Sequence, residues 1–241
     1  MSYRPREFWE RRLAEQFDLR GTGETGLPLA YNRACYALRR EVLDRALRAA
    51  DCDPARKRVL DVGCGAGFFV EYYLGRGARV TGLDIAAISV ERLRERFPQA
   101  RFVLGDASEA ALGERFDLVN AFDVLYHIVD DSRWEGALRN LAAAVEPGGL
   151  LLVTDAFAEI PGAAEHNRMR SLARYREALG SAGIELHGLH PTHVLLNYDL
   201  GAFRFLNRAP GLLLALDRAL LALGAGRGPS HNKLLVARRV R

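Results

Sequence analysis

The stretch Asp61-Val62-Gly63-Cys64-Gly65-Ala66-Gly67 decides the fold. It begins within a short strand-like run at 59–62 and precedes an apolar segment at 68–74, so we expect a strand to end and a helix to begin there. Glycine lets the backbone turn tightly and approach a ligand without a Cβ in the way. A glycine-rich loop at a strand–helix junction is how doubly wound α/β folds hold nucleotide-like ligands.

The same strand–turn–helix order repeats along the chain. Alternating units of this length predict an α/β fold with a mostly parallel sheet. We expect helical segments within 6–50 with a glycine-rich break, strands at 59–62, 79–83, 101–104, 116–122 and 150–154, and helices at 68–74, 88–97 and 134–145. The less regular last third predicts a helix at 171–182, a strand within 184–196, an apolar helix at 212–223 and a last strand at 232–238.

Composition excludes several classes of protein. The 241 residues hold 34 basic and 30 acidic side chains, and no dense basic stretch with interleaved aromatics indicates nucleic-acid binding. The three cysteines form no C-x-x-C pair, which argues against a disulfide framework and favours a reducing cytoplasm. The N-terminus is too charged for a signal peptide, and no apolar run is long enough for a transmembrane segment.

Acidic residues follow the next two strands. Asp84 ends the second strand and Asp106 follows the third. A carboxylate at the end of the second strand can accept two hydrogen bonds from vicinal ribose hydroxyls. NAD-binding folds use the same arrangement, but their loop requires G-x-G-x-x-G/A, and Phe68 occupies the last position of that pattern. An NAD-dependent oxidoreductase is therefore disfavoured.

The loop, the three acids and the turn Glu146-Pro147-Gly148-Gly149, taken in order over 58–155, resemble class I S-adenosylmethionine-dependent methyltransferases. The resemblance implies a doubly wound, seven-stranded, mostly parallel sheet with an antiparallel last strand, and S-adenosylmethionine as cofactor. It also implies that Asp61 orients the loop and the methionine end of the cofactor, that Asp84 binds the ribose and that Asp106 accepts a hydrogen bond from the adenine amino group. The expected cofactor-binding residues are Asp61, Gly63, Cys64, Gly65, Gly67, Asp84, Ile85, Asp106, Ala107 and Phe122.

Two histidines are candidate catalytic residues. His127 follows the fourth strand beside Tyr126, and it can take the proton of a hydroxyl acceptor. His166 follows the fifth strand, where it and Arg170 could bind a polar or anionic acceptor. The alternatives are that His127 caps a helix or packs beside the cofactor, and that His166 lies in a solvated loop. We predict O-methylation of a small molecule; N- or C-methylation, or cofactor binding without catalysis, stay open.

The remaining features concern domain organisation and partners. A single domain is expected, with a helical lid at 1–54, a cofactor-binding core at 55–160 and an acceptor-site segment with the last strands at 161–241.

His187, His190 and His193 cannot share one face of a strand, and Pro191 prevents a helix through them, so no metal site is expected. Core burial is the first expectation for the apolar helix at 212–223; an acceptor pocket, a homodimer contact and a membrane surface are alternatives.

Overall fold

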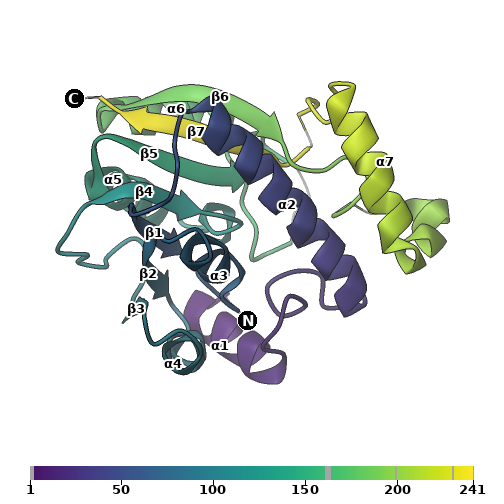
Figure 1. Ribbon diagram of the computed structural model, residues 1–241, viewed down its shortest axis with the longest axis horizontal. Coiled ribbons are helices and arrows are strands. Elements are labelled where there is room, and N and C mark those ends of the chain that lie inside the picture. Colours follow the sequence, from purple (N-terminus) through teal and green to yellow (C-terminus); the bar gives the residue numbers. More distant parts are fainter. Residues whose placement is uncertain (1–2, 161–163, 199, 230, 241) are drawn as a thin grey trace.

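The computed structural model describes residues 3–160, 164–198, 200–229 and 231–240, and a seven-stranded sheet forms its centre (Figure 1). The strand order is β3-β2-β1-β4-β5-β7-β6. Only β7 runs antiparallel to its neighbours β5 and β6 among the pairs of this sheet, which confirms the predicted fold class. The strands are β1 (Arg58–Val62), β2 (Arg79–Asp84), β3 (Arg101–Leu104), β4 (Phe116–Ala121), β5 (Val145–Asp155), β6 (Ile184–Pro191) and β7 (Lys233–Arg239).

Helices cover both faces of this sheet (Figure 1). On one face, α5 and α6 pack around Trp134, Leu138 and Tyr175. On the other, α2, α3 and α4 contribute a second core that includes Leu43 and Tyr73. The helices are α1 (Pro5–Glu15), α2 (Leu29–Ala49), α3 (Phe68–Leu74), α4 (Ala87–Arg96), α5 (Asp131–Ala144), α6 (Leu172–Ser181) and α7 (Pro210–Ala222), with short 3-10 helices η1 (Leu125–His127) and η2 (Gly201–Arg208).

Consecutive residues of β4 pack in the cores on opposite faces of the sheet. Leu118 packs in the core under α2, α3 and α4, whereas Val119 packs against α5. Because successive side chains of a strand point to opposite faces, a strand covered on both sides needs apolar residues at nearly every position. This requirement explains the apolar runs by which the strands could be recognised.

One strand begins earlier than expected. β5 starts at Val145, which pairs with Phe116, and not at Leu150. The register shifts between Phe116 and Leu118, and Gly148 adopts a left-handed φ of 80°. The proline–glycine segment is therefore part of β5, where it forms a bulge-like irregularity, and it does not separate the strand from α5.

The order of strands reverses between β1 and β4. The chain proceeds outward from β1 to β2 and β3, then returns to β4 on the other side of β1. In open α/β sheets, ligands bind outside the carboxyl ends of the strands at such a switch point. The loops after β1, β2, β3 and β4 therefore mark where a site is to be sought.

The apolar helix α7 is not the core helix that its sequence suggested. Only Leu213 and Asp217 of this helix are buried. Leu213 joins a small cluster with Tyr31 and Leu38 of α2, and Figure 1 shows α7 lying beside that helix at one end of the molecule. A run of apolar residues predicts the helix but does not tell how many of its sides are covered.

The three predicted regions correspond to α1–α2 (1–54), β1–β5 with their helices (55–160), and α6 through β7 (161–241). These divisions stay predictions. Among the described residues, no helix combines the length and apolar character of a membrane span.

Asp217 is expected to be the main stabilising contact of α7. Its carboxylate accepts backbone N–H groups from Val194 at 3.2 Å, Leu195 at 2.6 Å and Leu196 at 3.0 Å. Asp217→Ala leaves these donors without a partner, so the free energy of unfolding should fall by at least about 2 kcal/mol in urea denaturation. Arg218→Ala, which removes only an exposed ion pair with Glu41, is the control and should change stability little. Equal effects of the two variants would contradict this role.

Candidate active site

A cavity lies outside the carboxyl ends of β1, β2, β3 and β4, as the reversal of strand order predicts. Its walls come from the loops after these strands and from the chain around α1 and α2. The predicted cofactor-binding residues that line it are Gly63, Cys64, Gly65, Asp84, Ile85, Asp106, Ala107 and Phe122. Asp61 and Gly67 lie behind this wall.

The glycine loop is shaped by close packing. Gly63, Gly65 and Gly67 have φ values of 67°, 49° and 82°. A Cβ on Gly63 would lie 2.4 Å from Cγ2 of Val124, and one on Gly65 would lie 2.5 Å from Cγ2 of Thr22. No side chain fits at either position, so the backbone itself forms the floor of the cavity.

Gly67 has a different role from the other two glycines. It is the N-cap of α3, and its Cβ would lie 2.6 Å from Cδ2 of Leu93 in α4. The third glycine therefore allows α3 and α4 to pack closely behind the loop.

Asp84 links β2 to the glycine loop. Its carboxylate accepts N–H groups from Gly65 at 2.7 Å and Ala86 at 2.9 Å, and burial raises its pKa. The same carboxylate also lines the cavity from the end of β2. This arrangement fits a ligand with vicinal hydroxyls.

Asp61 is buried directly behind the loop, where the side-chain amide of Asn120 donates to it. Burial raises its pKa to about 7, and the nearby Asp84 adds to this effect. Its position fits the predicted orientation of the loop. A direct contact with the cofactor stays a prediction.

Asp106 lines the cavity from the loop after β3. It accepts the backbone N–H of Ser108 at 2.8 Å and pairs with Arg133 at 2.8 Å. Although burial opposes ionisation, the hydrogen bonds from Ser108 and the charge of Arg133 lower the pKa of this carboxyl. Asp106 is thus an ionised acceptor in the wall of the cavity.

His127 lines the cavity from η1. Its Nδ1 lies 3.0 Å from the backbone carbonyl of His166, and a carbonyl only accepts, so Nδ1 holds the proton and Nε2 is left unprotonated. Burial lowers the pKa of His127 to about 4, so the ring is neutral at neutral pH. A neutral imidazole with a free Nε2 can accept a proton.

The other candidates near His127 support it from outside the cavity. The His166 ring stacks between Phe8 and His127, with centroids 5.1 Å and 5.6 Å away. Tyr126 packs beside His127 and does not line the cavity. Arg170 is buried under α5, where it pairs with Asp131 at 3.0 Å, so the suggested contact between Arg170 and an acceptor is wrong.

The helices before β1 cover this cavity. Trp9 and Leu13 of α1 and Tyr36 of α2 line it, and Trp9 meets His127 edge-on at 4.9 Å. The Glu10 carboxylate of α1 accepts the backbone N–H groups of Ala87 at 2.6 Å and Ile88 at 3.1 Å, at the start of α4. This position fits the predicted lid.

Sequence reasoning missed a buried ion pair at the wall of the cavity. Arg39 of α2 lies 2.8 Å from Asp123, which lines the cavity with a left-handed φ of 58°. Burial opposes the charge of Asp123, but Arg39 lowers the pKa of this carboxyl below its ordinary value. The sequence did contain a sign of this ion pair, because Arg39 lies on the buried stripe of α2 with Cys35, Val42 and other apolar residues, where a charged side chain needs a partner.

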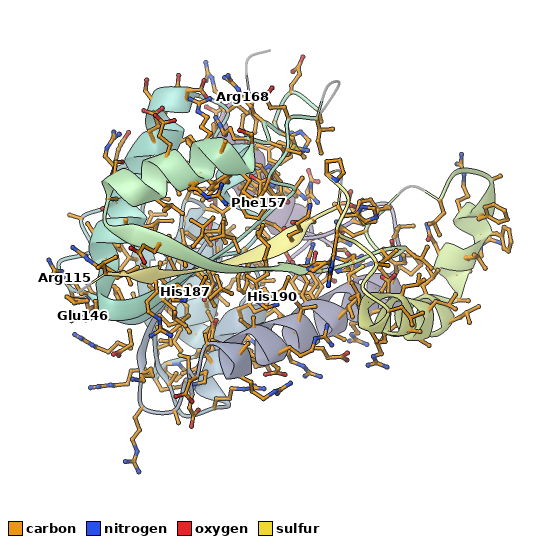
Figure 2. All side chains as sticks on the ribbon, turned by 90° about the horizontal axis from the view of Figure 1, so that it is seen from above. Arg115, Glu146, Phe157, Arg168, His187 and His190 are labelled. Atoms are coloured by element: carbon orange, nitrogen blue, oxygen red, sulfur yellow. The ribbon has the colours of Figure 1, made fainter. Side chains whose placement is uncertain are left out.

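The three histidines of the 187–193 segment have separate surroundings. His187 and His190 lie along β6 (Figure 2), and His193 is buried beyond the strand against Thr192 and the Cys35 carbonyl. Within the part of the chain that the structure describes, no group of three or more His, Cys, Asp or Glu side chains is arranged to hold a metal ion.

The chain is similar to known methyltransferases. A family model described as a methyltransferase domain matches residues 33–193, more than half of the chain. Over 101 residues the chain is 37% identical to a ubiquinone biosynthesis O-methyltransferase of Stutzerimonas stutzeri, covering 39% of this chain and 42% of that protein. Over 131 residues it is 31% identical to an amino-sugar nucleotide N,N-dimethyltransferase of Saccharopolyspora spinosa, covering 50% and 52%. The chain thus spans about half the length, or less, of these relatives.

A solved structure shares the fold over the full length. The N-methyltransferase NodS from Bradyrhizobium japonicum, solved with S-adenosyl-L-homocysteine, superposes with a TM-score of 0.66 over 98% of both chains at 18% identity. At this identity the likeness concerns the arrangement of helices and strands alone.

The glycine loop gives a direct test of the cavity. Gly63→Ala should weaken binding of S-adenosyl-L-homocysteine at least about tenfold, because the new Cβ displaces Val124 from the loop. Gly77→Ala is the matched control: Gly77 has a φ of 76°, but its Cβ would meet no atom within 4 Å. Both variants strain the backbone, so only Gly63→Ala should lose binding in calorimetric titration. Equal losses would show that the packing against Val124 is unimportant.

Proposed function

We propose that this chain, which belongs to the methyltransferase domain family, transfers the methyl group of S-adenosylmethionine to a hydroxyl oxygen of a small molecule. One observation supports the proposal above others: the glycine loop, Asp84, Asp106 and His127 all line the same cavity. S-adenosylmethionine is the cofactor of this family. It supplies an activated methyl group, so the protein has mainly to orient the acceptor and exclude water.

The carboxylates would hold the cofactor by its polar groups. Asp84 lines the cavity and would accept from the ribose hydroxyls, and Asp106 is ionised and would accept from the adenine amino group. Gly63 and Gly65 leave room for the remainder of the cofactor at the carboxyl end of β1. These assignments follow the chemistry of the donors and acceptors that face the cavity.

The walls of the cavity favour an apolar acceptor. Its lining includes the apolar side chains of Trp9, Leu13, Tyr36, Phe68 and Phe69. Asp123, a further carboxylate of the lining, is paired with Arg39. A small hydroxylated molecule with an apolar body fits such a lining, and the similarity to a ubiquinone biosynthesis O-methyltransferase is compatible with it.

His127 would remove the proton of the acceptor hydroxyl. The His166 carbonyl holds the ring in the tautomer with Nε2 unprotonated, and the proton would pass from the hydroxyl oxygen to Nε2 as the methyl group arrives. The His166 side chain would contribute by packing, since it does not line the cavity. An amine or carbon acceptor would need no such base.

We also propose the class of substrate and the cellular compartment in which the reaction takes place. The net charge of +4 is small and spread along the chain, which favours a small molecule over nucleic acid. Cys35, Cys52 and Cys64 are free thiols, which suits a reducing cytoplasm. A homodimer through α7 is tested below.

Cofactor binding is tested by calorimetry with S-adenosyl-L-homocysteine. We expect the wild type to bind and Asp84→Ala to lose at least about tenfold in affinity, because charge-assisted bonds to the ribose disappear. Asp44→Ala, which removes a carboxylate of α2 paired with Arg76 outside the cavity, should bind as the wild type does. Failure of the wild type to bind would overturn the proposed function, and full binding by Asp84→Ala would overturn the ribose assignment.

The base role of His127 is tested by turnover with an acceptor found by screening hydroxylated aromatic compounds with labelled methyl donor. His127→Gln should lower kcat by about 100-fold or more and leave cofactor binding intact, because an amide cannot take the proton. His166→Gln retains the backbone carbonyl that orients His127 and should lower kcat far less. Nearly unchanged turnover in His127→Gln would instead indicate N- or C-methylation.

A further inference from the structure

A large apolar surface lies outside the cavity, on η2 and α7. It consists of Phe203, Phe205, Leu212, Leu216 and Leu223, of which Phe203 is 63%, Phe205 60% and Leu223 84% exposed. We call it the η2–α7 face. Most of the large apolar side chains that are exposed in the described residues belong to it. Patches of this kind mark interaction surfaces in proteins.

This face cannot turn inward. Leu213 and Asp217, one helical turn apart, form the inner side of α7, with Leu213 packed on α2 and Asp217 holding the backbone at 194–196. Leu212, Leu216 and Leu223 therefore point away from the body of the protein. Figure 2 shows the same segment at one end of the molecule, away from the labelled Arg115 and Glu146.

The charges on this segment are of one sign. Arg204 stands between the two exposed phenylalanines and Arg208 follows them; both are exposed and form no ion pair with residues that the structure describes. Asp217 is the only acidic residue within the described range 200–229, and it is buried. The η2–α7 face thus offers apolar side chains beside unpaired guanidinium groups.

A second copy of the chain fits this pattern poorly. A two-fold dimer brings the same patch of both subunits together. Arg204 and Arg208 would then face their own copies, with no free carboxylate in 200–229 to neutralise them. A partner with a negatively charged surface and an apolar interior would match both the exposed apolar side chains and the guanidinium groups.

We propose that the η2–α7 face binds an anionic phospholipid surface. The phenyl and leucyl side chains enter the boundary between headgroups and acyl chains, and the guanidinium groups of Arg204 and Arg208 contact the phosphates. With 13 residues, α7 is about 20 Å long, so it lies along the membrane and does not cross it. The opposite side of α7, at Leu213, packs on α2, whose Tyr36 lines the cavity.

The test is sedimentation of the full chain with large vesicles made of equal parts phosphatidylglycerol and phosphatidylcholine, or of phosphatidylcholine alone. The wild type should bind the anionic vesicles, more weakly at high salt, and should bind the neutral vesicles far less. Phe203→Ser with Phe205→Ser should lower the partition coefficient at least about tenfold. Arg204→Gln with Arg208→Gln should lower it by about 25-fold, a factor of about five for each charge.

Matched controls separate this face from general charge and apolarity. Leu189→Ser removes an exposed leucine of β6, and Arg79→Gln with Arg115→Gln removes two exposed charges elsewhere; both should bind as the wild type does. Binding of S-adenosyl-L-homocysteine or, failing that, circular dichroism verifies that each variant is folded.

Any of three outcomes would overturn the proposal. The first is that the wild type does not bind anionic vesicles at low salt. The second is that the phenylalanine variant binds them as well as the wild type does. The third is a wild-type dimer in sedimentation velocity that the phenylalanine variant converts to monomer, which assigns the face to a second copy.

Discussion

The contact between the glycine loop and Val124, in the segment that follows β4, governs the whole site. The backbone at Gly63 lies so close to Val124 that no side chain fits between them. Ser89 donates to the Gly65 carbonyl at 2.6 Å while Asp84 accepts the Gly65 N–H, so the loop is held from both sides. Because the loop, the carboxylate of β2 and η1 are fixed against one another, the cavity exists before any ligand enters it.

A second constraint joins the covering helices to this centre. Arg39 and Asp123 are both nearly buried, and Thr154 of β5 donates to Asp123 at 3.0 Å. A buried ion pair is strongly destabilised when one partner is lost, so α2 has one position relative to the end of β4. His127 follows Asp123 by four residues, and the same pair therefore fixes the ring that we assign as base.

The sheet and most of the cofactor side of the cavity could be predicted from sequence because both depend on local pattern. Apolar runs define the strands, and Gly63, Asp84 and Asp106 stand where those strands end. The covering residues, such as Leu13 and Thr22, could not be predicted, since they reach the cavity only through contacts between distant segments. The burial of α7 was overestimated for the same reason: apolarity predicts a helix but does not say which sides find a partner.

The Glu10 contact has a consequence for how ligands exchange. The residue preceding α4, Ala86, provides no side-chain cap, and Glu10 fills that place from a different helix. Losing a helix cap costs about 1 kcal/mol, a few times thermal energy at most. Release of the Glu10 contact alone therefore costs little, and Asp84, which we propose as the ribose ligand, lies two residues before Ala86 at the place where that contact is made.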